Sequence, residues 1–199
     1  MPMPKIFTTR LSENRDAVWA ALASALDRCL LEKPLAKISL AEIAALAGIA
    51  RNTTYNYARD KDGLVEAIVE HYADVIVSEV TEIAAGPQSP EERIRAIVLA
   101  ILAWVADAEH RAIVGHAILG VASDFTKPPR TLMLIREQIL AVTEQGAKAG
   151  AFRDNATLTW SLLSGVIHAA TTQVVRQPLV RPQVETEATR IILASIRRS

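Results

Sequence analysis

The chain has 199 residues, half of them hydrophobic, with 22 basic and 22 acidic side chains and a formal net charge of zero. This composition excludes an intrinsically disordered chain, and the zero charge excludes a whole-molecule field that would draw the protein to nucleic acid or membrane. The single cysteine, Cys29, excludes an internal disulfide and a zinc site built from cysteines.

The N-terminal sequence MPMPKIFTTR lacks the apolar core of a signal peptide, and no run of about 18 apolar residues could span a bilayer. We therefore expect a cytoplasmic protein with no membrane partner. Alanine, leucine and isoleucine are abundant, which favours helices, so we expect an all-α fold. Residues 1–61 hold nine Lys or Arg against six Asp or Glu, a balance of +3, and the remainder holds the opposite excess.

The first predicted helix covers residues 12–31 and ends before Pro34. Its apolar residues recur at intervals of three and four positions, which keeps them on one face. Because Cys29 belongs to this face, we expect it to be packed rather than reactive. The stripe consists of Val18, Leu22, Ala25, Leu26 and Cys29.

A second, short helix is expected after Ser39, whose side chain can cap it, with Glu42 three residues later completing a capping box. Gly48 ends this helix, because glycine readily adopts the left-handed conformation of a helix exit. A third helix is expected over 51–57, and Asp60 is the expected cap of a long fourth helix. Two short helices joined by a turn with glycine predict a helix-turn-helix.

Gly86 and Pro87 interrupt the fourth helix, and Ser89, Pro90 and Glu92 carry the signals that start the next one. We therefore expect three parts in the chain. They are a helix-turn-helix domain over residues 1–60, a connecting helix over 61–85 and a second helical domain over 86–199.

The second domain is predicted to contain further helices. Residues 157–176, with Asp154 as a possible cap, are apolar or small on nearly all sides, so this helix must be covered all round. A partner helix from a second copy and full burial within one chain are the two alternatives. Apolar stripes also predict helices over 94–105, 132–142 and 183–198, with a shorter one over 110–121.

The stretch ARNTTYNYAR places long polar side chains where a helix would enter a DNA groove. Arg51 and Asn52 lie at the start of the third helix, and arginine suits guanine as asparagine suits adenine. Tyr55 and Asn56 follow one turn later on the same side. A polar surface helix of an ordinary bundle is an equal alternative on spacing alone. The remaining candidate DNA contacts, all to phosphate, are Thr53, Tyr57, Ser39 and Lys61.

The sequence SLAEIAALAGIARNTTYNYARDKDGLVEAI resembles the N-terminal domain of the TetR family of transcriptional regulators. The resemblance covers residues 12–75 and extends, by length and layout, to the whole chain. It implies about nine helices, with a ligand-binding and dimerisation domain after the helix-turn-helix domain. It also implies a homodimer joined by the two C-terminal helices, a palindromic DNA operator and repression relieved by a small-molecule effector.

Three positions depart from the family pattern. Ala50 replaces the usual Ser or Thr, which weakens the cap of the third helix by about 1 kcal/mol. Thr54 replaces a large apolar residue and Ala58 replaces Phe, a loss that costs about 3–5 kcal/mol unless neighbours refill the space. The candidates to refill it are Trp19, Leu30 and Leu31.

The resemblance implies a ligand pocket in the second domain, and pockets of this kind combine an apolar lining with a few polar groups. Core packing is the alternative for each candidate residue. The apolar lining favours a small, largely apolar effector. The candidates are Trp104, His116, Phe125, Met133, Trp160 and His168.

No glycine-rich phosphate loop, metal-ligand spacing or nucleophile elbow occurs in the sequence, so we expect neither an enzyme nor a cofactor. The departures at Ala50, Thr54 and Ala58 motivate one rival hypothesis. In it, the protein is a helical adaptor of the same fold that no longer binds DNA.

Overall fold

The computed structural model describes residues 5–107, 112–116 and 130–198, and within them the regular elements are α-helices and two short 3-10 turns. The expectation of an all-α fold is confirmed. The chain forms two compact units, Met1–Val69 and Glu70–Ser199, whose boundary falls within one long helix.

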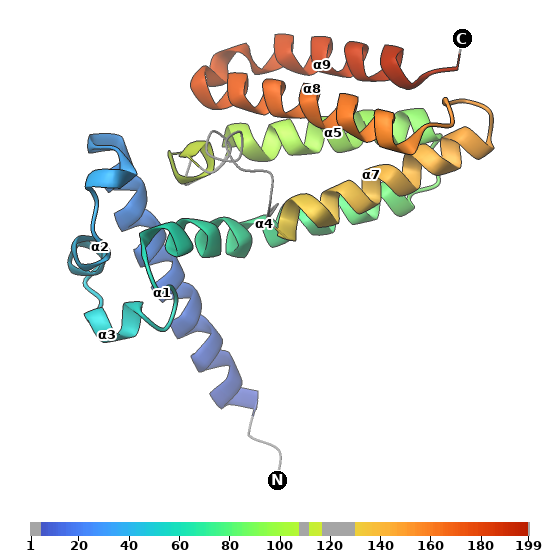
Figure 1. The fold of residues 1–199 in the computed structure, drawn as a ribbon. Helices are drawn as coiled ribbons and strands as arrows, with labels where there is room; N and C mark the ends of the chain where they lie inside the picture. Colours follow the sequence, from blue (N-terminus) through green and yellow to red (C-terminus); the bar gives the residue numbers. More distant parts are fainter. Residues whose placement is uncertain (1–4, 108–111, 117–129, 199) are drawn as a thin grey trace. The chain divides into compact units, whose positions relative to one another are not determined.

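The first unit holds α1 (Lys5–Glu32), the 3-10 turn η1 (Leu35–Lys37), α2 (Leu40–Ala47), α3 (Arg51–Thr54) and the start of α4 (Lys61–Ala85) (Figure 1). Helix α1 begins earlier than predicted. Helix α1 contacts α2, and its buried side chains are mostly aliphatic. The largest fully buried side chains of this unit are Leu22, Leu26, Ile43, Leu64 and Ile68.

The predicted caps of the first unit are confirmed. Ser39 Oγ accepts a hydrogen bond from the Glu42 N–H at 3.2 Å, and Asp60 Oδ1 accepts one from the Gly63 N–H at 2.7 Å. Gly48 ends α2 with φ of 67°, the left-handed conformation expected of glycine there. The Glu42 carboxylate accepts from Lys33 Nζ at 2.6 Å, which ties α2 to the segment that follows α1.

The second unit holds residues 70–85 of α4, followed by α5 (Pro90–Asp107), α7 (Arg130–Lys148), α8 (Ala156–Arg176), the turn η2 (Pro178–Val180) and α9 (Arg181–Ile196). Residues 112–116 are also helical. Helices α5, α8 and α9 contact one another, and α7 packs against α5 and α8 (Figure 1). The predicted apolar stripe of α5 is buried in full. It consists of Ile94, Ile97, Val98, Ile101 and Val105.

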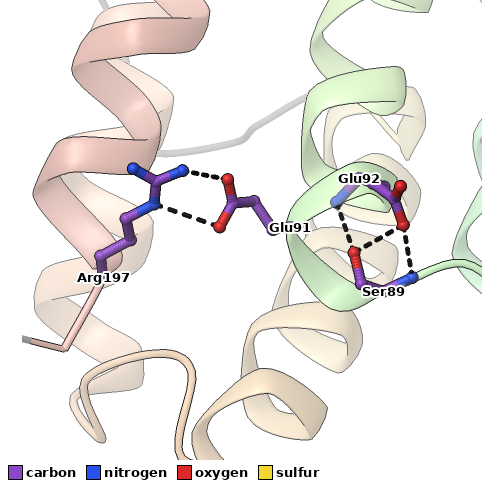
Figure 2. Close-up of polar contacts among 4 residues, drawn as sticks. All are labelled: Ser89, Glu91, Glu92 and Arg197. Atoms are coloured by element: carbon purple, nitrogen blue, oxygen red, sulfur yellow. Dashed lines mark hydrogen bonds and ion pairs between the residues drawn. The ribbon is translucent and has the colours of Figure 1, made fainter.

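The start of α5 confirms the predicted capping box (Figure 2). The Ser89 N–H donates to Glu92 Oε2 at 3.0 Å, and the Glu92 N–H donates to Ser89 Oγ at 3.3 Å. At α8 the cap is Asn155, whose Oδ1 accepts from the Leu158 N–H at 3.1 Å. The prediction of Asp154 was therefore wrong by one residue, because both side chains can accept such a bond.

The C-terminal end of the chain contacts two earlier segments of the second unit. Phe152 and Arg197 form an isolated antiparallel bridge, and the Arg153 N–H donates to the Ile196 carbonyl oxygen at 2.9 Å. Arg197 also forms an ion pair with Glu91, in the first turn of α5, through two hydrogen bonds (Figure 2). None of the described helices is long and apolar enough to cross a membrane.

Candidate nucleic-acid interface

Helix α3 is shorter than the predicted 51–57. It covers Arg51–Thr54, and the backbone then tightens into turns in which the Asn56 N–H bonds to the Thr53 carbonyl oxygen at 3.0 Å. The Tyr57 N–H bonds to the Thr54 carbonyl oxygen at the same distance. These bonds span three residues, as in a 3-10 helix, so the chain still turns helically through the predicted range.

The segment has an exposed polar side and a buried side. Arg51, Asn52, Tyr55 and Asn56 are exposed. Thr54, by contrast, has no exposed surface. The long donors and acceptors therefore point away from the core of the first unit. The other two candidates on this segment, Thr53 and Tyr57, are half-buried.

Arg51 and Tyr55 lie against each other on the exposed side. Arg51 Nη2 donates a hydrogen bond to Tyr55 Oη at 3.2 Å, and Arg51 Cζ lies 5.7 Å from the centroid of the Tyr55 ring. Residues four apart on a helix are neighbours, which explains the contact. The predicted placement of Arg51 and Tyr55 on one side of the helix is confirmed.

Ser39 and Lys61 have roles within the first unit. The Ser39 hydroxyl is exposed while it caps α2. Lys61 Nζ donates to the carbonyl oxygens of Leu35 and Ala36, at 2.8 Å and 3.1 Å. These bonds use two of the three donors of the ammonium group and tie the start of α4 to η1.

The three departures from the family pattern have visible consequences. Ala50 precedes α3 without a side-chain cap bond, as predicted. The Thr54 hydroxyl donates to the Ala50 carbonyl oxygen at 3.4 Å. Ala58 is buried, and nearby the Trp19 ring contacts Tyr57 edge-on. Leu31 is 74% exposed, so it does not refill the space.

One further exposed cation follows this segment in the chain. Arg59 is exposed in the turn after α3 and stands in the same polar run as Arg51. Arg59 is not among the predicted DNA contacts, because it lies beyond the predicted helix. The signal in the sequence that could have identified Arg59 was its position between the candidate Tyr57 and the N-cap Asp60.

The candidate ligand residues lie in the second unit. Trp104 and Trp160 are half-buried and pack against its core, and Arg136 Cζ lies 5.6 Å from the centroid of the Trp160 ring. His116 and His168 are half-buried, and Met133 is exposed. Phe125 lies outside the described residues. The role of these residues in ligand binding stays a prediction.

Residues 22–68 match the family model described as bacterial regulatory proteins of the tetR family. This match covers the core of the first unit, including the whole exposed segment that begins at Arg51. No curated protein sequence matches the chain.

Solved structures resemble the chain over most of its length. A TetR family transcription regulator from Marinobacter aquaeolei VT8 shares 16% identity, covers 94% of this chain and all of its own, and superposes with a TM-score of 0.69. The fatty acid degradation regulator FadR from Bacillus halodurans shares 15% identity over 89% of this chain and 93% of its own, with a TM-score of 0.72. SmeT, the repressor of the SmeDEF multidrug efflux pump of Stenotrophomonas maltophilia, shares 16% identity over 91% of each chain, with a TM-score of 0.68.

Proposed function

We propose that the chain is a DNA-binding transcriptional regulator of the TetR family, whose family model matches residues 22–68. We propose that it binds a palindromic operator as a homodimer and that a small, largely apolar effector releases it from the DNA. We propose repression as the sign of control, because SmeT, which shares the fold, is a repressor. The proposed parts are residues 1–60 for DNA binding, 61–85 as the connecting helix, and 86–199 for dimerisation and effector binding.

The observation that carries the DNA-binding role is the exposed polar side of α3 and the turns after it. Arg51 and Asn52 occupy the start of the helix, where a recognition helix reaches base edges in the major groove. Tyr55 and Asn56 extend this side by one turn. Thr53, Tyr57, Ser39 and the third donor of Lys61 are the proposed phosphate contacts, which fix the register of the helix on the duplex.

The homodimer is supported by apolar side chains left exposed on the last two long helices. Leu158 and Leu162 of α8 are 52% and 43% exposed, and Ile191 of α9 is 43% exposed. Their neighbours Leu163 and Ile192 are buried, so each helix already has one face in the core of its own chain. A second copy would cover the other face, and a two-fold dimer would present two copies of α3 to a palindrome.

The effector is proposed to bind in the second unit among Trp104, His116, Phe125, Met133, Trp160 and His168. FadR, which shares the fold, is a fatty acid degradation regulator, and an apolar effector suits the aromatic candidates here. To release DNA, the effector must bind the DNA-free conformation more tightly than the DNA-bound one, with a coupling of about 1–3 kcal/mol as is usual.

Selection of bound sequences from random duplex DNA tests DNA binding and symmetry together. We expect enrichment of a palindrome whose half-sites lie about 34 Å apart, one DNA turn, or somewhat more. Binding to random duplex should weaken steeply with salt, with a logarithmic slope near −0.9 for each phosphate contacted. A protein that enriches no sequence and shows no salt-dependent binding would instead be the helical adaptor.

The dimer is tested by Leu162→Glu, which places a charge on the exposed apolar face of α8. We expect the variant to sediment as a monomer and to lose operator affinity, because a single α3 reads only one half-site. Leu31→Glu is the matched control, since Leu31 is 74% exposed on the first unit. This variant should sediment with the same mass as the wild-type dimer. A wild-type chain that sediments as a monomer would contradict the proposal.

A further inference from the structure

Arg51 and Tyr55 form a preassembled pair on the exposed side of α3. We propose that Tyr55 is a positioning residue whose hydroxyl holds the Arg51 guanidinium for one guanine in each operator half-site. The inference rests on the proposed function, since it assigns the way in which one residue of that DNA-binding surface selects its base. Tyr55 then acts on specificity through Arg51.

The contact engages the hydroxyl end of the tyrosine. Tyr55 Oη accepts from Arg51 Nη2 at 3.2 Å, while Arg51 Cζ lies 5.7 Å from the ring centroid. A guanidinium has five N–H donors in a planar fork, so one bond to a hydroxyl leaves enough donors for a bidentate contact. Guanine offers the matching pair of acceptors, O6 and N7, in the major groove.

The charge of Arg51 is not taken up by an acid. Within the described part of the chain, the ion pairs do not include Arg51, and its hydrogen-bond partner Tyr55 is neutral. Both side chains are exposed, so neither is required for the core of the first unit. The pair therefore keeps a full positive charge available at the surface.

Tyrosine suits the positioning role because its side chain has few rotatable bonds. An exposed arginine is flexible and must lose rotamer freedom when it binds a base. The rigid Tyr55 ring is anchored one helical turn away, and its hydroxyl restricts the guanidinium before DNA arrives. Preorganisation of this kind strengthens recognition of the correct base, because a bidentate contact depends on geometry.

The test compares wild type, Tyr55→Phe, Arg51→Ala and the double variant on the selected operator and on operators changed one base pair at a time. Wild type is expected to prefer guanine at one half-site position roughly 10-fold or more. Tyr55→Phe keeps the ring and should reduce that preference several-fold, a larger factor than any change in its binding to random duplex. Arg51→Ala should abolish the preference, and adding Tyr55→Phe to it should change nothing further.

Arg59→Ala is the matched control, because Arg59 is an exposed cation of the same segment outside the pair. It should weaken binding to all sequences alike and leave the guanine preference intact. Thermal unfolding of each variant checks that the fold is kept. Tyr55→Phe that weakens every sequence equally, or effects of the two substitutions that add, would overturn the inference while DNA binding stands. A wild-type protein without salt-dependent DNA binding would overturn both this inference and the proposed function.

Discussion

The indole of Trp19 and the phenol ring of Tyr57 meet edge to face, with centroids 4.8 Å apart and ring planes at 90°. Trp19 lies in α1 and is 8% exposed, whereas Tyr57 lies in the turns directly after α3. The pair therefore fixes the end of the proposed DNA-reading segment to the longest helix of the first unit. It also supplies aromatic packing next to Ala58, where the family pattern has Phe.

Trp19→Ala should destabilise the first unit by about 3–5 kcal/mol, because it removes a buried aromatic side chain and leaves a cavity. Urea unfolding followed by circular dichroism measures the change. Leu31→Ala, at a position 74% exposed in the same helix, should change the unfolding free energy by less than about 0.5 kcal/mol. Equal effects of the two substitutions would show that the Trp19 contact does not stabilise the unit.

Ala50→Ser should stabilise the first unit by about 1 kcal/mol. Ala50 occupies the N-cap of α3 with φ of −58° and ψ of 136°, and its side chain makes no cap bond. A serine there can accept a bond from one of the free N–H groups at the start of the helix. Urea unfolding followed by circular dichroism measures the gain. Ser39→Ala is the comparison, because it removes the cap bond from the Glu42 N–H and should lower the unfolding free energy by a similar amount. No gain from Ala50→Ser would mean that these N–H groups are already well solvated.

The caps of α2, α4 and α5 were the most predictable part of the fold. Ser39, Gly48, Asp60 and Ser89 act where they were expected, because each signal depends on residues only a few positions away. The polar side of α3 was predictable for the same reason. A spacing of four residues brings Arg51 and Tyr55 together in any helix.

Contacts between residues far apart in the sequence were not predictable. Lys61 was expected to face phosphate from a helix N-terminus, yet its ammonium bonds to carbonyl oxygens that lie 25 and 26 residues earlier. The ion pair of Glu91 and Arg197 joins residues 106 positions apart. No local pattern encodes such pairs, since they depend on how the helices pack.

Gly146→Ala should destabilise the second unit by about 1–3 kcal/mol, as overpacking of a core does. A Cβ at Gly146 would overlap the ring of Phe152, which is 2% exposed and held by the bridge between Phe152 and Arg197. Thermal unfolding measures the loss. Gln145→Ala is the matched control on the exposed side of α7 and should be close to neutral. A neutral Gly146→Ala would mean that the Phe152 ring can move aside.

The capping box at the start of α5 should make stability depend on pH. Hydrogen bonds donated by the Ser89 hydroxyl, and then by the Ser89 backbone N–H, hold the pKa of Glu92 below its ordinary value of 4.5. A carboxyl group with a lowered pKa in the folded state stabilises the fold fully above the pKa of the unfolded state. That contribution is lost as the pH falls below about 4.5 and through the folded pKa.

Glu92→Gln isolates this contribution, because glutamine keeps the shape of the side chain and does not titrate. The midpoint of thermal unfolding should be higher for wild type than for Glu92→Gln at pH 7, and the difference should shrink steadily between pH 4.5 and pH 3. In a Ser89→Ala background the same substitution should show a smaller pH dependence, since the hydroxyl donor is gone. A wild-type advantage that is constant from pH 7 to pH 3 would show that the carboxylate form of Glu92 does not stabilise the start of α5.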